Sequence, residues 1–245
     1  MNKKSSVILF LHGGPGLDSS YLKSWFDDLR DDYDLYFYNQ DYESHGNGIL
    51  YNLYIQLLNH VNKLRSEYND IILFCHSWSN IILLKSIEYD PNIIENFSKV
   101  IFANPSSICW DKFQEFGDKL FSRIPPNQAE QIMQCKTGLE IMKLALPYYV
   151  GNPNKVPLIH FETYDDMAFE KVSEELENFD LSAYCNKLSS DYCFTIYCEN
   201  DIENIDDSMC LANNSKVFMF NKAGHFPFAE YNQEYMNLLK DILKP

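Results

Sequence analysis

Ser77 is the residue whose surroundings best fit a nucleophile. It lies in the stretch IILFCHSWS, residues 71–79, where a strand-like apolar run gives way to a segment of helical period. A serine at such a sharp turn exposes its hydroxyl group, provided that the positions two before and two after it are small. Glycine usually occupies both positions, whereas this sequence has Cys75 and Ser79. The stretch therefore indicates an altered nucleophile turn, although an ordinary strand-to-helix connection is the alternative.

Two further residues have the chemistry to assist such a serine. His225, in AGHFPF at 223–228, follows the last strand-like run and can accept the proton of a serine hydroxyl group. Asp201, three residues beyond the fifth run, can accept the imidazole N–H and fix the tautomer. Asp206 and Asp207 are nearby alternatives, and position favours Asp201. Each residue alone means little, but the three together predict nucleophilic catalysis.

A glycine-rich turn, HGGPG at residues 12–16, follows the first strand-like run. Such a turn can direct a backbone N–H at the negative charge that develops on a reacting carbonyl oxygen. We expect the N–H groups of Gly14 and Trp78 to form this oxyanion hole. A turn that only permits tight packing is the alternative, and the agreement of four features weighs against it.

The elements that must position these residues alternate between short β-rich runs and longer helical segments. This alternation is typical of an α/β fold, a doubly wound, mainly parallel sheet with helices on both faces. The expected strands are 7–11, 35–38, 71–75, 100–103, 193–198 and 216–220, and the expected helices are 21–30, 50–68, 78–89 and 233–243.

Residues 106–183 interrupt this alternation. Apolar residues recur there every three or four positions, and prolines divide the segment into separate helices. A structureless loop of this length is improbable in a compact domain. We therefore expect an α/β core in two parts, 1–105 and 184–245, with a helical cap inserted at 106–183.

Composition excludes several other classes of protein. The 245 residues include 20 Lys and Arg against 35 Asp and Glu, a formal net charge of -15. Such a polyanion repels phosphates, so we expect no nucleic-acid partner. No apolar run approaches the roughly 18 residues of a membrane span, so no membrane association is expected either. The expected partner is a small-molecule or short-peptide substrate, and the oligomeric state is left open.

The cysteines and the first residues indicate the compartment. The seven cysteines are odd in number and form no zinc-type CxxC pair, which favours reduced, buried thiols over disulfides. The apolar run 7–11 has five residues, whereas a secretory signal needs about 7 to 15. We therefore expect a cytoplasmic protein, and nothing in the motifs calls for a metal ion or an organic cofactor.

The order serine, aspartate, histidine, with each residue after its expected strand, resembles the α/β-hydrolase superfamily. The HGGPG turn and the His-Ser-Trp sequence at the nucleophile are similar to its proline iminopeptidase branch. The resemblance covers about two thirds of the chain and implies an acyl-enzyme mechanism. It assigns Ser77 as nucleophile, His225 as base, Asp201 as the residue that orients the base, and Gly14 and Trp78 as oxyanion donors.

Besides Cys75 and Ser79, the sequence departs from this family at three places. A D-x-R-G-x-G-x-S stretch of many relatives reads DYESHGNG at 41–48, with Glu43 in place of the arginine, and Cys198 replaces a glycine before the acidic residue. Relatives also begin with a two-strand hairpin, for which the six residues before the first strand are too few. We therefore expect six parallel strands in the spatial order second, first, third, fourth, fifth, sixth.

The expected function is that of a serine hydrolase acting on a small ester, thioester or amide. Four aromatic residues are expected to line its pocket, namely Trp110, Tyr148, Tyr149 and Phe226. The alternatives are a proline iminopeptidase-type aminopeptidase, an acyltransferase or cyclase with the same triad, and a non-catalytic ligand-binding protein of this fold. Relatives of the iminopeptidase branch bind the substrate amine with acidic cap residues, for which the candidates are Glu140, Glu162, Asp165 and Asp166.

Overall fold

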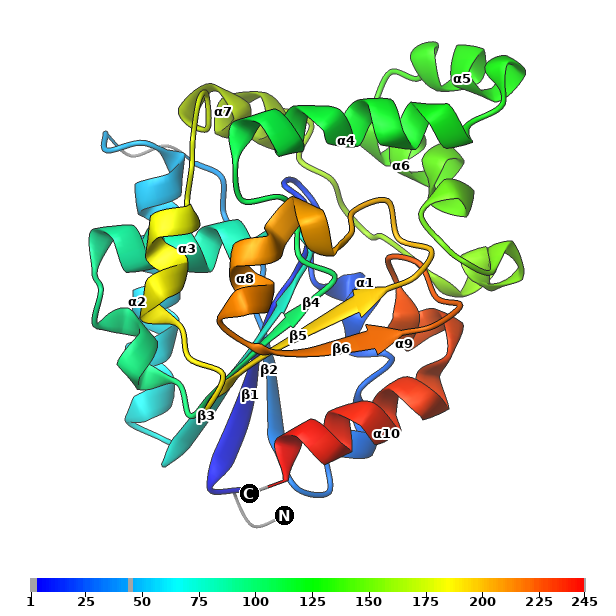
Figure 1. Cartoon of the computed structure of the whole chain (residues 1–245). Helices are drawn as coiled ribbons and strands as arrows, with labels where there is room; N and C mark the ends of the chain where they lie inside the picture. Colours follow the sequence, from blue (N-terminus) through cyan, green and yellow to red (C-terminus); the bar gives the residue numbers. More distant parts are fainter. Residues whose placement is uncertain (1–3, 44–45, 245) are drawn as a thin grey trace.

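A parallel sheet of six strands organises the protein (Figure 1). The computed structural model describes residues 4–43 and 46–244. The strands are β1 (Ser6–Leu11), β2 (Asp34–Phe37), β3 (Asp70–His76), β4 (Lys99–Ala103), β5 (Cys193–Cys198) and β6 (Lys216–Phe220). Neighbouring strands pair in the order β2-β1-β3-β4-β5-β6, and each pair is parallel. The predicted fold class and the predicted strand order are confirmed.

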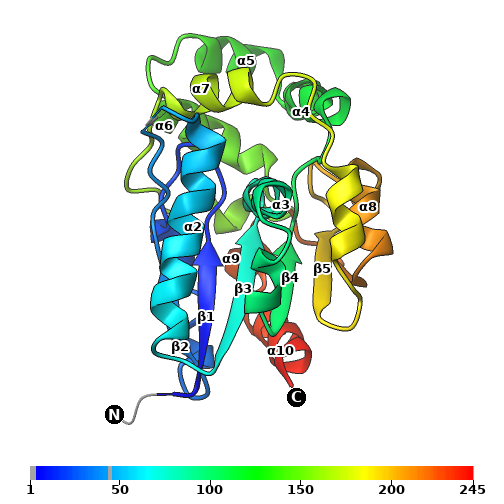
Figure 2. The ribbon, with the colours of Figure 1, turned by 90° about the vertical axis from the view of Figure 1, so that its left-hand side faces the viewer.

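Helices cover both faces of the sheet (Figures 1 and 2). The α-helices are α1 (Ser20–Lys23), α2 (Ile49–Arg65), α3 (Ser79–Tyr89), α4 (Trp110–Arg123), α5 (Pro126–Met133), α6 (Gly138–Ala145), α7 (Ala168–Glu175), α8 (Met209–Asn213), α9 (Pro227–Glu230) and α10 (Asn232–Leu243). Short 3-10 helices lie at 27–29, 93–96, 146–148, 153–158, 182–187 and 205–208.

Two hydrophobic cores explain why the strands read as continuous apolar runs. Successive side chains of β1 point to opposite faces, and both faces are buried. Val7, Leu9 and Leu11 belong to one core together with residues of α2, α3 and α8, whereas Ile8 and Phe10 belong to the other core together with residues of α1, α9 and α10. Burial on both sides therefore fixes β1 firmly between two helical layers.

The predicted helix at 21–30 is wrong in its extent. The α-helix ends at Lys23, and a separate 3-10 turn covers Asp27–Leu29. The break places Phe26 in the core, where its ring lies 4.7 Å from that of Phe10 and 5.2 Å from that of Phe74, measured between centroids. Burial of this aromatic side chain outweighs one or two further turns of helix.

The segment between β4 and β5 contains helices and turns but no strand among its residues. Helices α4 to α7 lie together beyond the carboxyl ends of the strands (Figures 1 and 2). Pro126 at the start of α5 and a capping box of Thr137 and Glu140 at α6 separate neighbouring helices. The division into core and cap at residues 106 and 183 stays a prediction.

All seven cysteines are free thiols, and four of them are buried. Within 4–43 and 46–244, no helix has the length and apolar character needed to cross a membrane. Glu43 is exposed at the position of the family's arginine, and its neighbours Ser44 and His45 lie outside the described residues.

Candidate active site

Ser77 lies at the turn between β3 and α3 with φ of +56°. This left-handed conformation is costly for a residue with a side chain, and such strain is typical of nucleophile turns. The Ser77 N–H donates to the carbonyl oxygen of Ala103 on β4 (3.0 Å), which helps to hold the turn. A Cβ atom added to Gly13 would lie 3.0 Å from the Ser77 Cβ, so the glycine-rich turn packs directly against the serine.

The two altered positions around Ser77 keep the turn intact for identifiable reasons. Cys75 is fully buried between strand and helix, where its small side chain fits. The Ser79 hydroxyl group lies within hydrogen-bond distance of the carbonyl oxygens of Leu11 (3.1 Å) and His76 (2.8 Å). Ser79 thus joins β1 to the nucleophile turn without leaving a buried polar group unpaired.

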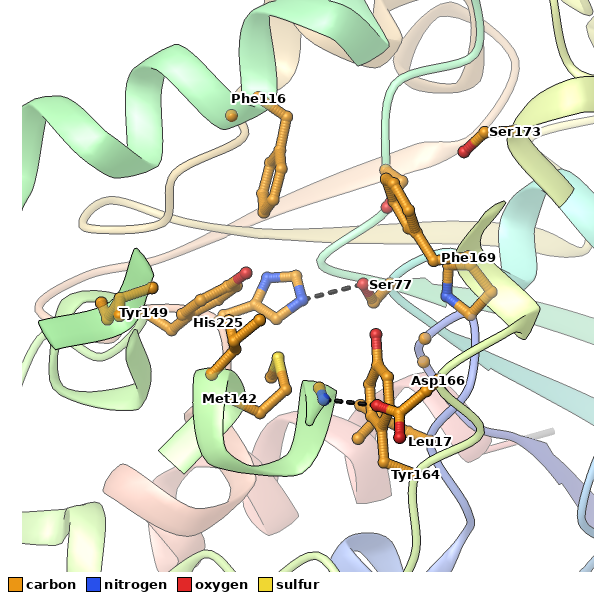
Figure 3. A pocket seen from close by; sticks show the side chains of 18 of the residues that line it. Leu17, Ser77, Phe116, Met142, Tyr149, Tyr164, Asp166, Phe169, Ser173 and His225 are labelled. Atoms are coloured by element: carbon orange, nitrogen blue, oxygen red, sulfur yellow. Dashed lines mark hydrogen bonds between the residues drawn. The ribbon is translucent and has the colours of Figure 1, made fainter. Parts of the chain in front are cut away.

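His225 connects Ser77 to Asp201. Its Nε2 lies 2.9 Å from the Ser77 Oγ (Figure 3), and its Nδ1 lies 3.0 Å from each Asp201 carboxylate oxygen. Because a carboxylate can only accept, Nδ1 carries the proton and Nε2 accepts from the serine hydroxyl group. Burial lowers the pKa of His225, but the negative charges of Asp201, Glu203 and Glu230 outweigh this effect and raise it above 6.5.

Asp201 is held by donors other than the histidine. Its Oδ2 accepts from the Asn104 amide (2.6 Å), and its Oδ1 accepts from the Ile202 N–H (2.6 Å). The competing Asp207 instead pairs with Lys119 and accepts from the Asn204 N–H, and Asp206 is exposed. The structure therefore brings Asp201, and neither competitor, to His225.

A buried chain of hydrogen bonds also joins the glycine-rich turn to the histidine loop. The Gly13 N–H donates to the Tyr21 hydroxyl oxygen (2.6 Å), which lies 2.7 Å from the His76 Nδ1. The His76 Nε2 lies 2.9 Å from the backbone oxygen of His225. A carbonyl can only accept, so His76 donates from Nε2 and Tyr21 donates to Nδ1. Burial holds the pKa of His76 well below 6.5, which keeps this arrangement neutral.

The predicted oxyanion donors lie on segments that Gln40 connects. Its side-chain oxygen accepts from the Trp78 indole N–H (3.0 Å), and its side-chain nitrogen donates to the His12 carbonyl oxygen (2.8 Å). Among the described residues, neither the backbone N–H of Gly14 nor the backbone N–H of Trp78 donates to another group. Both N–H groups are therefore free to bind a ligand, and their role as an oxyanion hole stays a prediction.

A cavity of about 930 Å³ opens over Ser77 and His225. Figure 3 shows Phe116, Met142, Tyr149, Tyr164 and Phe169 around these two residues, so the wall is largely apolar and comes mostly from the segment between β4 and β5. Apolar surroundings lower the local dielectric constant and so strengthen electrostatic interactions near the serine.

Three of the four predicted pocket residues line this cavity, namely Trp110, Tyr149 and Phe226. Tyr148 does not; it lines a separate, smaller hollow that also includes Arg123. The cause is the 3-10 turn at Leu146–Tyr148, which directs neighbouring side chains to different sides of the chain. Of these two adjacent tyrosines, only Tyr149 therefore faces the cavity.

Of the four acidic cap candidates, only Asp166 lines the cavity. Its carboxylate accepts from the Gly138 N–H (Figure 3). Glu140 belongs to the capping box of α6, Asp165 accepts from the Met167 N–H, and Glu162 is exposed. A helix cap, a turn hydrogen bond and exposure to solvent therefore account for Glu140, Asp165 and Glu162 respectively.

Several residues of the site are absent from the sequence-based expectations, among them Asn104, Glu230 and Glu203. Asn104 follows β4 in the left-handed region (φ +51°), and an Asn-Pro pair directly after a strand could have indicated it. Glu230 is buried and accepts from the Gly224 N–H (2.9 Å) and the Asn152 N–H (2.8 Å). Glu203 is buried in the cavity wall, and nothing in the local sequence indicated its burial.

The site shows no arrangement for a metal ion. Over the described ranges, no group of three or more His, Cys, Asp or Glu side chains is placed to bind one.

Comparison with known proteins gives structural neighbours only. No protein-family model matches the sequence, and no curated protein matches it. A proline iminopeptidase-related protein from Thermus thermophilus is similar in structure, with a TM-score of 0.72, 14% identity, and coverage of 98% of this chain and 89% of that one. An esterase from Exiguobacterium antarcticum gives a TM-score of 0.71 and 14% identity, with coverage of 99% and 94%.

A proline iminopeptidase from Mycobacterium smegmatis is a further neighbour, with a TM-score of 0.65, 12% identity, and coverage of 98% of this chain and 89% of that one. These neighbours and the sheet order show that the chain has the α/β-hydrolase fold. The similarity extends over nearly the whole chain, including the segment between β4 and β5.

Proposed function

We propose that the protein is a serine hydrolase that cleaves a small ester, thioester or amide through an acyl-enzyme on Ser77. The observation that carries this proposal is the hydrogen-bonded series from Ser77 through His225 to Asp201 at the base of a cavity. Such an arrangement activates a hydroxyl group that is otherwise a weak nucleophile.

In the proposed reaction, His225 removes the hydroxyl proton as the Ser77 Oγ attacks the substrate carbonyl carbon. Asp201 keeps Nδ1 protonated and stabilises the imidazolium that forms. His225 then gives the proton from Nε2 to the leaving group, which departs and leaves the acyl group on Ser77. A water molecule, deprotonated by His225, releases the acid and restores the serine.

The N–H groups of Gly14 and Trp78 are proposed to stabilise the oxyanion in both steps. Removal of one oxyanion donor in a serine hydrolase costs about 10²–10³ in kcat. The Gln40 bridge and the Tyr21–His76 connection support this role because they fix the two donor segments relative to His225.

The apolar wall favours a substrate with a hydrocarbon or aromatic part. An N-terminal-proline aminopeptidase is the second candidate, supported by Asp166 in the cavity and by the iminopeptidase neighbours. An acyltransferase or cyclase would differ only in the group that resolves the acyl-enzyme. A non-catalytic binding protein of this fold would have no need for the aligned Ser77, His225 and Asp201.

A fluorophosphonate probe tests the proposal directly. We expect wild-type protein to be labelled at Ser77 and the Ser77→Ala variant to remain unlabelled. An unlabelled wild-type protein, under conditions that label a known serine hydrolase, would refute the proposal that the protein is a serine hydrolase. Parallel assays with proline-naphthylamide and short-chain p-nitrophenyl esters separate the two candidates, since ester turnover without prolyl release excludes the aminopeptidase.

A further inference from the structure

Glu203 is a carboxyl group at the cavity that the proposed mechanism does not use. It lies two residues after Asp201, in the wall of the cavity that contains Ser77 and His225, and only 3% of the residue is exposed. No lysine or arginine pairs with it among the described residues. A buried carboxyl without a cationic partner is costly to maintain, which points to a specific use.

The two carboxyl oxygens of Glu203 differ in their hydrogen bonds. Its Oε1 accepts from both the N–H (2.9 Å) and the hydroxyl group (2.7 Å) of Ser107. Its Oε2 is buried and has no hydrogen-bond partner in the described part of the chain. Glu203 lines the cavity, so this second oxygen is the part of the carboxyl group that is left to bind a ligand there.

Both protonation states of Glu203 are populated near neutral pH. Burial raises its pKa to about 7, aided by the charge of Asp201, while the Ser107 hydrogen bonds and His225 act in the opposite direction. The free oxygen is therefore a donor when protonated and an acceptor when ionised. Tyr149 and Tyr197, whose own pKa values Glu203 helps to raise, are neutral at this pH and do not alter this balance.

We propose that Glu203 binds a hydroxyl group of the substrate, so that the protein prefers hydroxylated acyl groups over unsubstituted ones. A hydroxyl group both donates and accepts, so it satisfies the free oxygen in either protonation state. A substrate ammonium group carries three N–H donors, and the single free oxygen would leave two of them facing a largely apolar wall. This inference rests on the proposed hydrolase function.

The test compares p-nitrophenyl hexanoate with its 3-hydroxy, 6-hydroxy and 6-amino derivatives. For wild-type protein we expect kcat/KM for at least one hydroxylated ester to exceed that for the parent by about tenfold. Glu203→Leu should abolish this preference, so that its kcat/KM values for the parent and the hydroxylated esters become similar. Glu199→Gln, which removes a carboxylate that is exposed, should retain the preference and serves as the matched control.

Several results would overturn the inference. Equal rates for all neutral esters, or a preference that survives Glu203→Leu, would remove the role of Glu203. A preference for the amino ester that Glu203→Leu abolishes would assign the site to a cation instead. If wild type hydrolyses no ester, the proposed function fails separately. Calorimetry with the Ser77→Ala variant then decides, because 6-hydroxyhexanamide should bind about tenfold more tightly than hexanamide only when Glu203 is present.

Discussion

Replacement of Asp201 by asparagine is the sharpest test of the proposed catalytic residues. The Asp201 carboxylate accepts from three donors, namely the Ile202 N–H, the Asn104 amide and the His225 Nδ1–H. An asparagine has one oxygen for these donors, and its NH₂ group must face at least one of them. The Ile202 N–H is fixed in the backbone and keeps the oxygen, so the NH₂ group takes the place of Oδ2.

The NH₂ group then faces two donors, namely the Asn104 amide, which can turn its oxygen towards it, and the His225 ring, which can change its tautomer. The histidine proton can move from Nδ1 to Nε2, after which Nδ1 accepts from the new NH₂ group. The Nε2–H then faces the Ser77 hydroxyl group, so it can no longer remove the hydroxyl proton. The analogous change in a known serine protease lowers kcat about 10⁴-fold while the geometry is kept. We expect a loss of this size for Asp201→Asn.

The assay measures p-nitrophenyl ester turnover and fluorophosphonate labelling together with thermal unfolding. The exposed Asp206→Asn variant is the control, since it removes the same charge five residues away, and its rate should stay within about twofold of wild type. A folded Asp201→Asn protein that works within about tenfold of wild type would refute the reasoning. Its role would then pass to another acceptor of the His225 proton.

Three further predictions follow from the buried polar groups. Tyr21→Phe leaves the Gly13 N–H and the His76 Nδ1 unpaired, so urea denaturation should show a loss of about 2–4 kcal/mol in unfolding free energy. A loss below about 1 kcal/mol would contradict the described hydrogen bonds. Activity requires neutral His225, whose pKa is raised, so kcat/KM should rise with pH through a midpoint above 6.5; a lower midpoint contradicts this assignment. Glu203 has a pKa of about 7 in the folded state, against 4.5 in the unfolded state. Its ionisation therefore destabilises the folded state increasingly from pH 4.5 to 7, by up to about 3 kcal/mol. The unfolding free energy of Glu203→Gln minus that of wild type should therefore increase between pH 5 and 8. A difference that stays constant over this range would contradict the raised pKa of Glu203.

The four central strands β1, β3, β4 and β5 were predictable because burial on both faces requires a continuous apolar run in the sequence. Ser77, Asp201 and His225 were predictable as neighbours because each follows a parallel strand, and such strand ends meet at one edge of the sheet. The helix prediction for 21–30 was wrong in extent because the local spacing of apolar residues does not show that Phe26 is buried in the tertiary structure.

The supporting residues of the site could not be derived in the same way. Glu203 and Glu230 are acidic residues in an acidic chain, and only the three-dimensional packing distinguishes them from exposed carboxylates. Tyr148 and Tyr149 are adjacent and identical, so only the direction of a 3-10 turn decides which one reaches the cavity. Side-chain direction in short irregular segments depends on contacts distant in sequence.

The attachment of the histidine loop has a consequence for engineering this protein. The His225 N–H donates to the Tyr149 carbonyl oxygen (2.7 Å), and the Glu230 carboxylate accepts from both the Gly224 N–H and the Asn152 N–H. A Cβ atom on Gly224 would lie only 2.3 Å from that same Tyr149 oxygen, so the two segments touch along their backbones. The helices over the cavity are therefore not an exchangeable module. A chimaera that imports them from another hydrolase must keep residues 149–152, because those residues are also the support of the base.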